Sequence, residues 1–289
     1  IGNMSQVNSI AANMTSAFSI PATVTGIVLV IIGALVIVGG LKRIAAVTEK
    51  LVPFMAIAYV IGALVIFFAN IGHVGAVFTA IFKGAFGLRA VGGGIVGSGV
   101  KLALTWGMKR GVFSNEAGLG SSVMVHSSSN VKEPVRQGLV SMTGTFLDTI
   151  IVCSMTGLAL VMTGAYQIPG LEGAAVTTAA FQTGLPFIPG EAVSFVLMIC
   201  LALFGFTTIL GWDYYGERCL EYFSNGSKKA VKAYRWAYIA CVFAGPYMTV
   251  AAVWTIADIF NACMAIPNMI ALIVLSGVVV RETKDFFKR

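Results

Sequence analysis

The chain has 289 residues, of which 57% are hydrophobic and only 11% are charged, and its mean hydropathy is +0.89. Soluble proteins carry about 25% charged residues, so this composition excludes the soluble globular class. The net charge of +7 does not indicate nucleic-acid binding, because the basic residues lie in short loops between apolar segments. The five cysteines form no C-x-x-C pair, which argues against a metal or redox role. We therefore expect an all-α polytopic membrane protein.

Apolar segments of the length that a bilayer requires, about 20 residues, recur along the chain. An incomplete helix at residues 1–14 comes first, and short amphipathic interludes at residues 73–99 and 167–189 separate some of the later segments. The interlude at 73–99 should contain a short surface helix at residues 76–86, and the loop at residues 42–50 should separate the first two crossings. The seven expected crossings are 21–41, 51–72, 100–128, 134–166, 189–212, 234–255 and 258–280.

Most lysines and arginines fall on one face of the membrane if residues 100–128 cross it once, as two half-helices. Basic residues in short loops favour the cytoplasmic side. We therefore expect a cytoplasmic C-terminus, an extracellular interlude at residues 73–99, and a multi-pass location in the cell membrane.

The run at residues 106–122, WGMKRGVFSNEAGLGSS, is the most informative stretch. It places two basic residues, an asparagine and a glutamate in apolar surroundings, and then ends any helix with Gly118 and Gly120. Non-helical backbone at membrane depth is tolerated only where it is buried in protein or lines a wet cavity. An interrupted helix is also the best sequence indication of a transporter binding site. The alternative is an ordinary cytoplasmic loop.

Other polar residues in apolar segments each allow two interpretations. Thr207 and Thr208 offer hydroxyls for a sodium site, or they bond back to their own helix. Asp148 couples ions, or it forms a structural pair with a base. Asn3 and Gln6 share a helix face and contact a substrate, or they form hydrogen bonds that hold helices together.

Four ionisable residues, Lys109, Arg110, Glu116 and Asp148, are candidates for internal ion pairs. We favour such pairs over direct substrate binding, because a buried charge that loses its partner costs about 3–5 kcal/mol. The sequence leaves open which acid pairs with which base.

Long blocks of the sequence, in order IGNMSQVNS, GGLKRIAAVTEKLVPFMA, GMKRGVFSNEAGLGSS, PVRQG, FLDTIIVCSMTG and NACMAIPNMIAL, resemble the alanine or glycine:cation symporter family, the sodium/alanine symporters. That family has a LeuT-type inverted-repeat fold of five plus five helices. The resemblance implies that this chain is the C-terminal portion of that fold, from the third core helix onward. Residues 1–72 would end the first repeat, and residues 100–289, with the broken helix at 114–120, would form the second.

The resemblance further implies a sodium-coupled secondary active symporter, not an enzyme, that imports alanine or glycine by alternating access and co-transports sodium. Its partners would be the small substrate and the lipid bilayer, with no nucleic acid. Thr207 and Thr208 would ligate sodium together with carbonyls of the first core helix. The expected substrate site comprises Asn3, Gln6, Phe113, Ser114, Asn115, Ala117, Gly118, Phe206 and Trp212. An ion channel, or a membrane protein of the same superfold with a different small solute, is the alternative.

Overall fold

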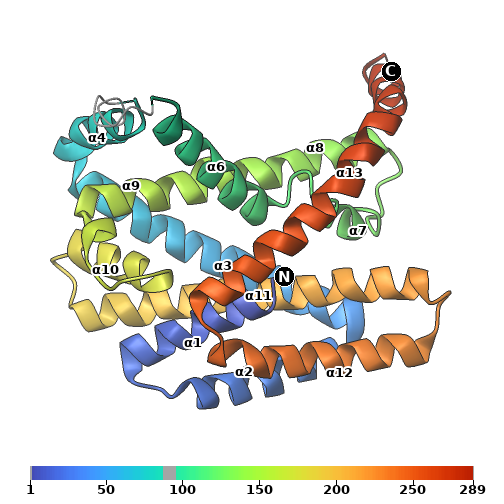
Figure 1. Ribbon diagram of the computed structural model, residues 1–289, viewed down its shortest axis with the longest axis horizontal. Coiled ribbons are helices and arrows are strands. Elements are labelled where there is room, and N and C mark those ends of the chain that lie inside the picture. Colours follow the sequence, from blue (N-terminus) through green and yellow to red (C-terminus); the bar gives the residue numbers. More distant parts are fainter. Residues whose placement is uncertain (1, 87–95, 289) are drawn as a thin grey trace. The chain divides into compact units, whose positions relative to one another are not determined.

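The computed structural model describes residues 2–86 and 96–288, and all regular secondary structure within these ranges is helical (Figure 1). Residues 87–95 of the expected extracellular interlude therefore lie outside the described residues. Four helical segments are long and apolar enough to cross a membrane, namely Gly40–Ala69, Pro134–Thr163, Gly190–Phe223 and Val250–Phe287. The expected class of an all-helical, multi-pass membrane protein is confirmed.

Contacts divide the chain into two compact units, Ile1–Val77 with Met155–Ala257, and Phe78–Ser154 with Asp258–Arg289. The first unit contains α1 (Met4–Phe18), α2 (Ala22–Ile37), α3 (Gly40–Ala69), η1 (Ile71–His73), η3 (Ala165–Gln167), α10 (Ala174–Gly184), α11 (Gly190–Phe223), α12 (Lys228–Ala244), η4 (Gly245–Tyr247) and most of α9 (Ser154–Thr163). The second contains α6 (Val96–Asn115), α7 (Ser122–His126), α8 (Pro134–Thr145), the π-helix η2 (Phe146–Cys153) and most of α4 (Val74–Phe86) and α13 (Val250–Phe287).

The core of the first unit forms around α11, which packs against α1, α3, α10 and α12. Among its most buried side chains are Val7, Ile209 and Leu210, each at most 1% exposed. Gly205 lets α1 approach closely, because a Cβ at this position would lie 2.7 Å from the Ile10 side chain. Small residues at helix contacts are the usual means of close packing in membrane proteins.

A tight turn joins α11 to α12, and the two helices lie side by side as a hairpin (Figure 1). Asn225 and Gly226 in this turn have left-handed backbone angles, with φ of 50° and 80°. Asparagine and glycine adopt this conformation more readily than other residues. Ser227 then caps α12, because its hydroxyl oxygen accepts a hydrogen bond from the Ala230 amide at 3.4 Å.

Several expected helix boundaries are wrong. Residues 42–50 were expected to form a loop, but α3 already begins at Gly40, whose φ is +68°, so the chain turns at the glycine pair before the basic residues. The final helix was expected to begin at residue 258, but it begins at Val250. The 3₁₀ turn η4, which contains Pro246, ends α12 at Ala244 and divides the segment expected at residues 234–255.

Candidate substrate and ion site

The helix that carries the run at 106–122 is interrupted in the second unit. α6 ends at Asn115 and α7 begins at Ser122, and we call residues 116–121 between them the break. Glu116, Gly118 and Gly120 in the break have φ values of 56°, 84° and 80°. The glycines adopt this left-handed conformation without penalty, whereas for the glutamate it costs about 1–2 kcal/mol. Strain of this kind gathers at ligand sites and persists where the surroundings enforce it.

Side chains at the end of α6 hold the start of the break in place. The Asn115 side-chain oxygen accepts a hydrogen bond from the Ala117 amide at 2.9 Å, and its Nδ2 donates to the Thr149 hydroxyl at 2.9 Å. Ser114 donates to the Asp148 carboxylate at 2.7 Å. Both partners lie on η2, and π-helices occur often at functional sites. Ser114 and Asn115, which directly precede the break, are therefore bound to η2.

The later part of the break is fixed to α13. The Asn268 side chain donates a hydrogen bond to the Gly118 carbonyl at 3.0 Å. It also lies so close to Gly120 that a Cβ there would come within 2.8 Å of its Oδ1. Within the break, the Ser121 hydroxyl donates to Glu116 Oε2 at 2.8 Å. The loop is thus held at a defined place next to α13, and a Cβ at Gly118 would meet no atom within 4 Å in the described structure.

The two basic residues before the break form ion pairs with Asp258, an acid that was not among the expected partners. Lys109 Nζ lies 3.4 Å and Arg110 Nη1 lies 3.6 Å from Asp258 of α13. Their side chains are 47% and 35% exposed, so each pair contributes less than about 1 kcal/mol. The pairs serve mainly to align α6 with α13.

Replacing Asp148 by asparagine should lower the stability of the protein before it alters substrate preference. The neutral amide oxygen still accepts the Ser114 hydrogen bond, but a bond to a charged acceptor is about twice as strong. We expect a loss of about 1 kcal/mol, measured as thermal denaturation in detergent. Ser114→Ala should give a similar loss, and the double variant should add little. A stable Asp148→Asn protein that has lost sodium coupling would instead place Asp148 on the ion path.

The other four expected substrate residues lie in the first unit, at the contact between α1 and α11. Asn3 is 3% exposed, and its side chain donates to the Tyr238 carbonyl of α12 at 3.1 Å. Gln6 lies against Gly205, and the Trp212 ring leaves no room for a Cβ at Gly2. Phe206 is buried in the same core. Asn3 therefore forms a hydrogen bond between helices, which is the second of the two roles considered for it. Its side-chain oxygen is buried and has no hydrogen-bond partner in the described structure.

The two threonines expected at the sodium site lie in the same stretch of α11. The Thr207 hydroxyl donates to the Leu203 carbonyl at 3.0 Å, and the Thr208 hydroxyl donates to the Phe204 carbonyl at 2.8 Å. Both threonines therefore form hydrogen bonds to their own helix, which was the alternative to a sodium site in the sequence analysis. The two roles do not exclude each other, because a hydroxyl that donates its proton keeps its oxygen lone pairs for a cation.

A buried acidic pair on α11 was not noticed in the sequence. Asp213 is fully buried, and neither of its carboxylate oxygens has a hydrogen-bond partner in the described structure. Glu217, one turn further on, is 4% exposed and accepts two hydrogen bonds from Arg235 of α12, one of them at 2.9 Å. The sequence did contain an indication of this pair. Two acids lie four residues apart near the end of an apolar helix, and an arginine follows in the next helix.

Comparison with known proteins decides the family. A sequence model described as the sodium:alanine symporter family matches residues 1–289. The chain belongs to this family. The members of this family are transporters rather than enzymes. The family resemblance found in the sequence is confirmed.

Individual relatives agree with the family match. The chain is 46% identical to a protein of Methanococcus maripaludis described as sodium/alanine symporter AgcS, over 99% of the chain and 61% of the relative. It is 49% identical to an uncharacterized transporter of Haemophilus influenzae, over 100% of the chain and 62% of the relative. It is 36% identical to a probable sodium/glutamine symporter, GlnT, of Bacillus subtilis, over 99% of the chain and 58% of the relative. The chain spans about three fifths of the length of these relatives.

Proposed function

We propose that the protein to which this chain belongs is a sodium-coupled symporter that imports a small neutral amino acid, alanine or glycine, across the cell membrane. The observation that carries the proposal is the family match over the whole chain. The related sodium/alanine symporter supports alanine, whereas the probable sodium/glutamine symporter, which is less similar, makes the choice of side chain a matter for experiment. We further propose a LeuT-type fold that works by alternating access, with the C-terminus in the cytoplasm.

Five of the proposed substrate residues lie in the second unit, at the end of α6 and in the break. A helix that ends leaves its last carbonyls without partners in the helix, and these carry partial negative charge. Ser114 and Asn115 form that end of α6, so their carbonyls would suit the ammonium group of an amino acid, and Phe113 would border the substrate. Ala117 and Gly118 would border the small side chain, because the space beside Gly118 is open. In the first unit, Asn3, Gln6, Phe206 and Trp212 are the other residues that we propose to contact the substrate.

The decisive experiment is uptake of radiolabelled alanine into proteoliposomes that contain the protein. An inward sodium gradient should drive alanine above its external concentration, and dissipating the gradient should end the accumulation. Excess unlabelled glycine should compete with alanine more strongly than glutamine does. Alanine flux that neither saturates nor concentrates the solute would identify a channel and overturn the proposal.

Thr208→Val should raise the sodium concentration that gives half-maximal alanine uptake by about tenfold or more. Its effect on alanine affinity at saturating sodium should be smaller. Valine has almost the same shape as threonine but lacks the hydroxyl oxygen that would ligate the ion. The measurement is the sodium concentration that gives half-maximal alanine uptake. Thr255→Val is a matched control, because Thr255 also donates to its own helix, at 2.8 Å from the Ala251 carbonyl, and is not proposed to ligate sodium. An unchanged sodium dependence in Thr208→Val would remove this residue from the ion site.

A further inference from the structure

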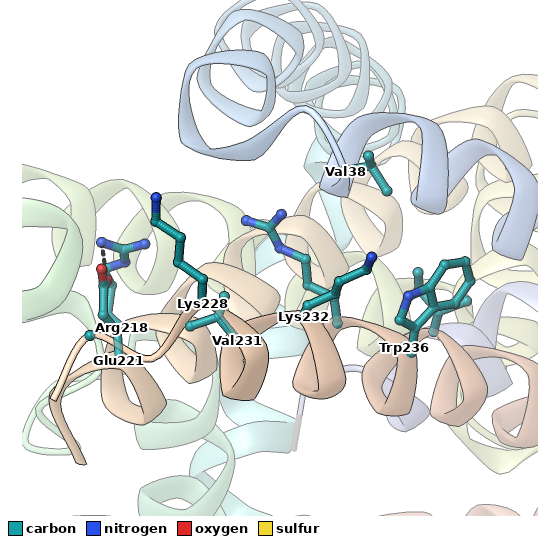
Figure 2. Close-up of a pocket in the computed structure, with 10 residues that line it drawn as sticks. Val38, Arg218, Glu221, Lys228, Val231, Lys232 and Trp236 are labelled. Carbon is teal, nitrogen blue, oxygen red and sulfur yellow. Dashed lines mark ion pairs between the residues drawn. The ribbon is translucent and has the colours of Figure 1, made fainter. Parts of the chain in front are cut away.

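A cavity of about 470 Å³ opens in the first unit, beside the turn between α11 and α12 and next to the end of α2 (Figure 2). Four of the side chains that line it are cationic, whereas one, Glu221, is acidic. The cations are Arg218, Lys228, Lys232 and Arg235. The cavity is therefore electropositive, and none of its lining residues is among those proposed to bind substrate or sodium.

The arginines are neutralised within the protein, but the lysines are not. Arg218 forms an ion pair with Glu221, which Figure 2 marks, and Arg235 forms one with Glu217. Lys228 and Lys232 are exposed, and the described part of the chain provides no carboxylate within 4.0 Å of either amine. Two uncompensated positive charges next to one cavity favour an anionic ligand over a neutral one.

The same cavity has an apolar side. Lys228, Lys232 and Trp236 follow one another at intervals of four residues, so they lie on one face of α12, as Figure 2 shows. Trp236 is 60% exposed, and Val38, which also lines the cavity, is 62% exposed. The lining therefore changes from charged to aromatic along α12, and Val38 at the end of α2 adds an aliphatic side chain. Such a surface fits a ligand with an anionic head and an apolar tail.

The neighbouring turn carries the features of a membrane interface. Tyr222 and Phe223 at the end of α11 are both 81% exposed, and their rings lie 5.7 Å apart. Aromatic residues concentrate at the level of the lipid headgroups. Exposed rings and exposed lysines near one turn are typical of the level at which lipid phosphates lie.

We propose that this cavity binds the phosphate headgroup of an anionic phospholipid. Lys228 and Lys232 contact the phosphate, and Trp236 with Val38 packs against the glycerol and the first carbons of the acyl chains. In the proposed orientation the lipid belongs to the cytoplasmic leaflet, where anionic lipids attract lysine and arginine. The site does not depend on the proposed transport function, because it rests on a separate cavity and on separate side chains.

The test uses the purified protein in mild detergent and three probes: phosphatidylglycerol, zwitterionic phosphatidylcholine and inorganic phosphate. Native mass spectrometry gives the dissociation constant of each. Phosphatidylglycerol should bind most tightly, and high salt should weaken its binding. In Lys228→Gln/Lys232→Gln we expect binding to weaken about 30-fold, which corresponds to about 2 kcal/mol. Thermal denaturation and elution volume should stay as in the unmodified protein, since both side chains are exposed.

The matched control is Lys229→Gln/Lys284→Gln, which removes the same charge from residues that do not line the cavity. It should retain phosphatidylglycerol binding within about threefold. Equal losses in both double variants would show unspecific charge attraction and overturn the proposal. Equal affinity for phosphatidylcholine would exclude recognition of an anionic lipid. Binding of inorganic phosphate as tight as that of phosphatidylglycerol would identify a soluble anion as the occupant, which also overturns it.

Discussion

Gly118→Leu is expected to abolish alanine binding, by more than about a hundredfold in affinity, while the protein still folds in detergent. A Cβ at this position would have no atom of the described structure within 4 Å, so a side chain there meets open space. That open space is where we place the substrate's small side chain. A side chain that occupies it should therefore exclude alanine by direct overlap.

Backbone strain is the competing explanation for such a loss, because Gly118 has a φ of +84°. Any L-residue at this φ costs about 1–2 kcal/mol, whatever its size. Gly118→Ala is the control, since it introduces the same strain with one carbon. Binding measured by isothermal titration should be much less impaired in Gly118→Ala than in Gly118→Leu. Equal losses would mean that the strain, and not occupation of the site, is responsible.

The class and family of this protein were readable from sequence because they depend on local and contiguous features. A composition with 11% charged residues excludes a soluble fold, and the family resemblance rests on contiguous blocks, among them the run at residues 106–122. The short surface helix expected at residues 76–86 is found as α4, Val74–Phe86, because its amphipathic spacing specifies it. The residues expected to bind substrate and sodium remain predictions.

What the sequence missed concerns partners that lie far apart along the chain. Asn268 and Gly118 are separated by 150 residues, and Lys109 and Asp258 by 149. Hydrophobic patterning predicts that a segment is helical, but it does not indicate which polar side chains meet after the helices pack. Asp258 and Asn268 both lie in the last expected helix, but the pattern of that helix gives no indication of their partners. Asp213 and Glu217 were overlooked because they follow an apolar segment that reads as an ordinary span.

Glu217→Gln should destabilise the protein by about 3 kcal/mol, the lower end of the cost of breaking a buried ion pair. Glu217 is 4% exposed and accepts two hydrogen bonds from Arg235. Glutamine keeps the size of the side chain but turns one acceptor into a donor that faces the guanidinium. It also leaves the positive charge, whose side chain is 28% exposed, without its partner.

Glu221→Gln is a matched control for this prediction, because it makes the same chemical change one turn further along α11. Glu221 pairs with Arg218, but the two side chains are 41% and 42% exposed, so the loss should stay below about 1 kcal/mol. The measurement is thermal denaturation in lipid-free detergent, which keeps the anionic-lipid cavity out of the comparison. Glu217→Gln/Arg235→Gln should be less destabilised than the sum of its two single variants, since neither charge is then left unpaired. Equal shifts for Glu217→Gln and Glu221→Gln would show that burial adds nothing to the Glu217–Arg235 pair.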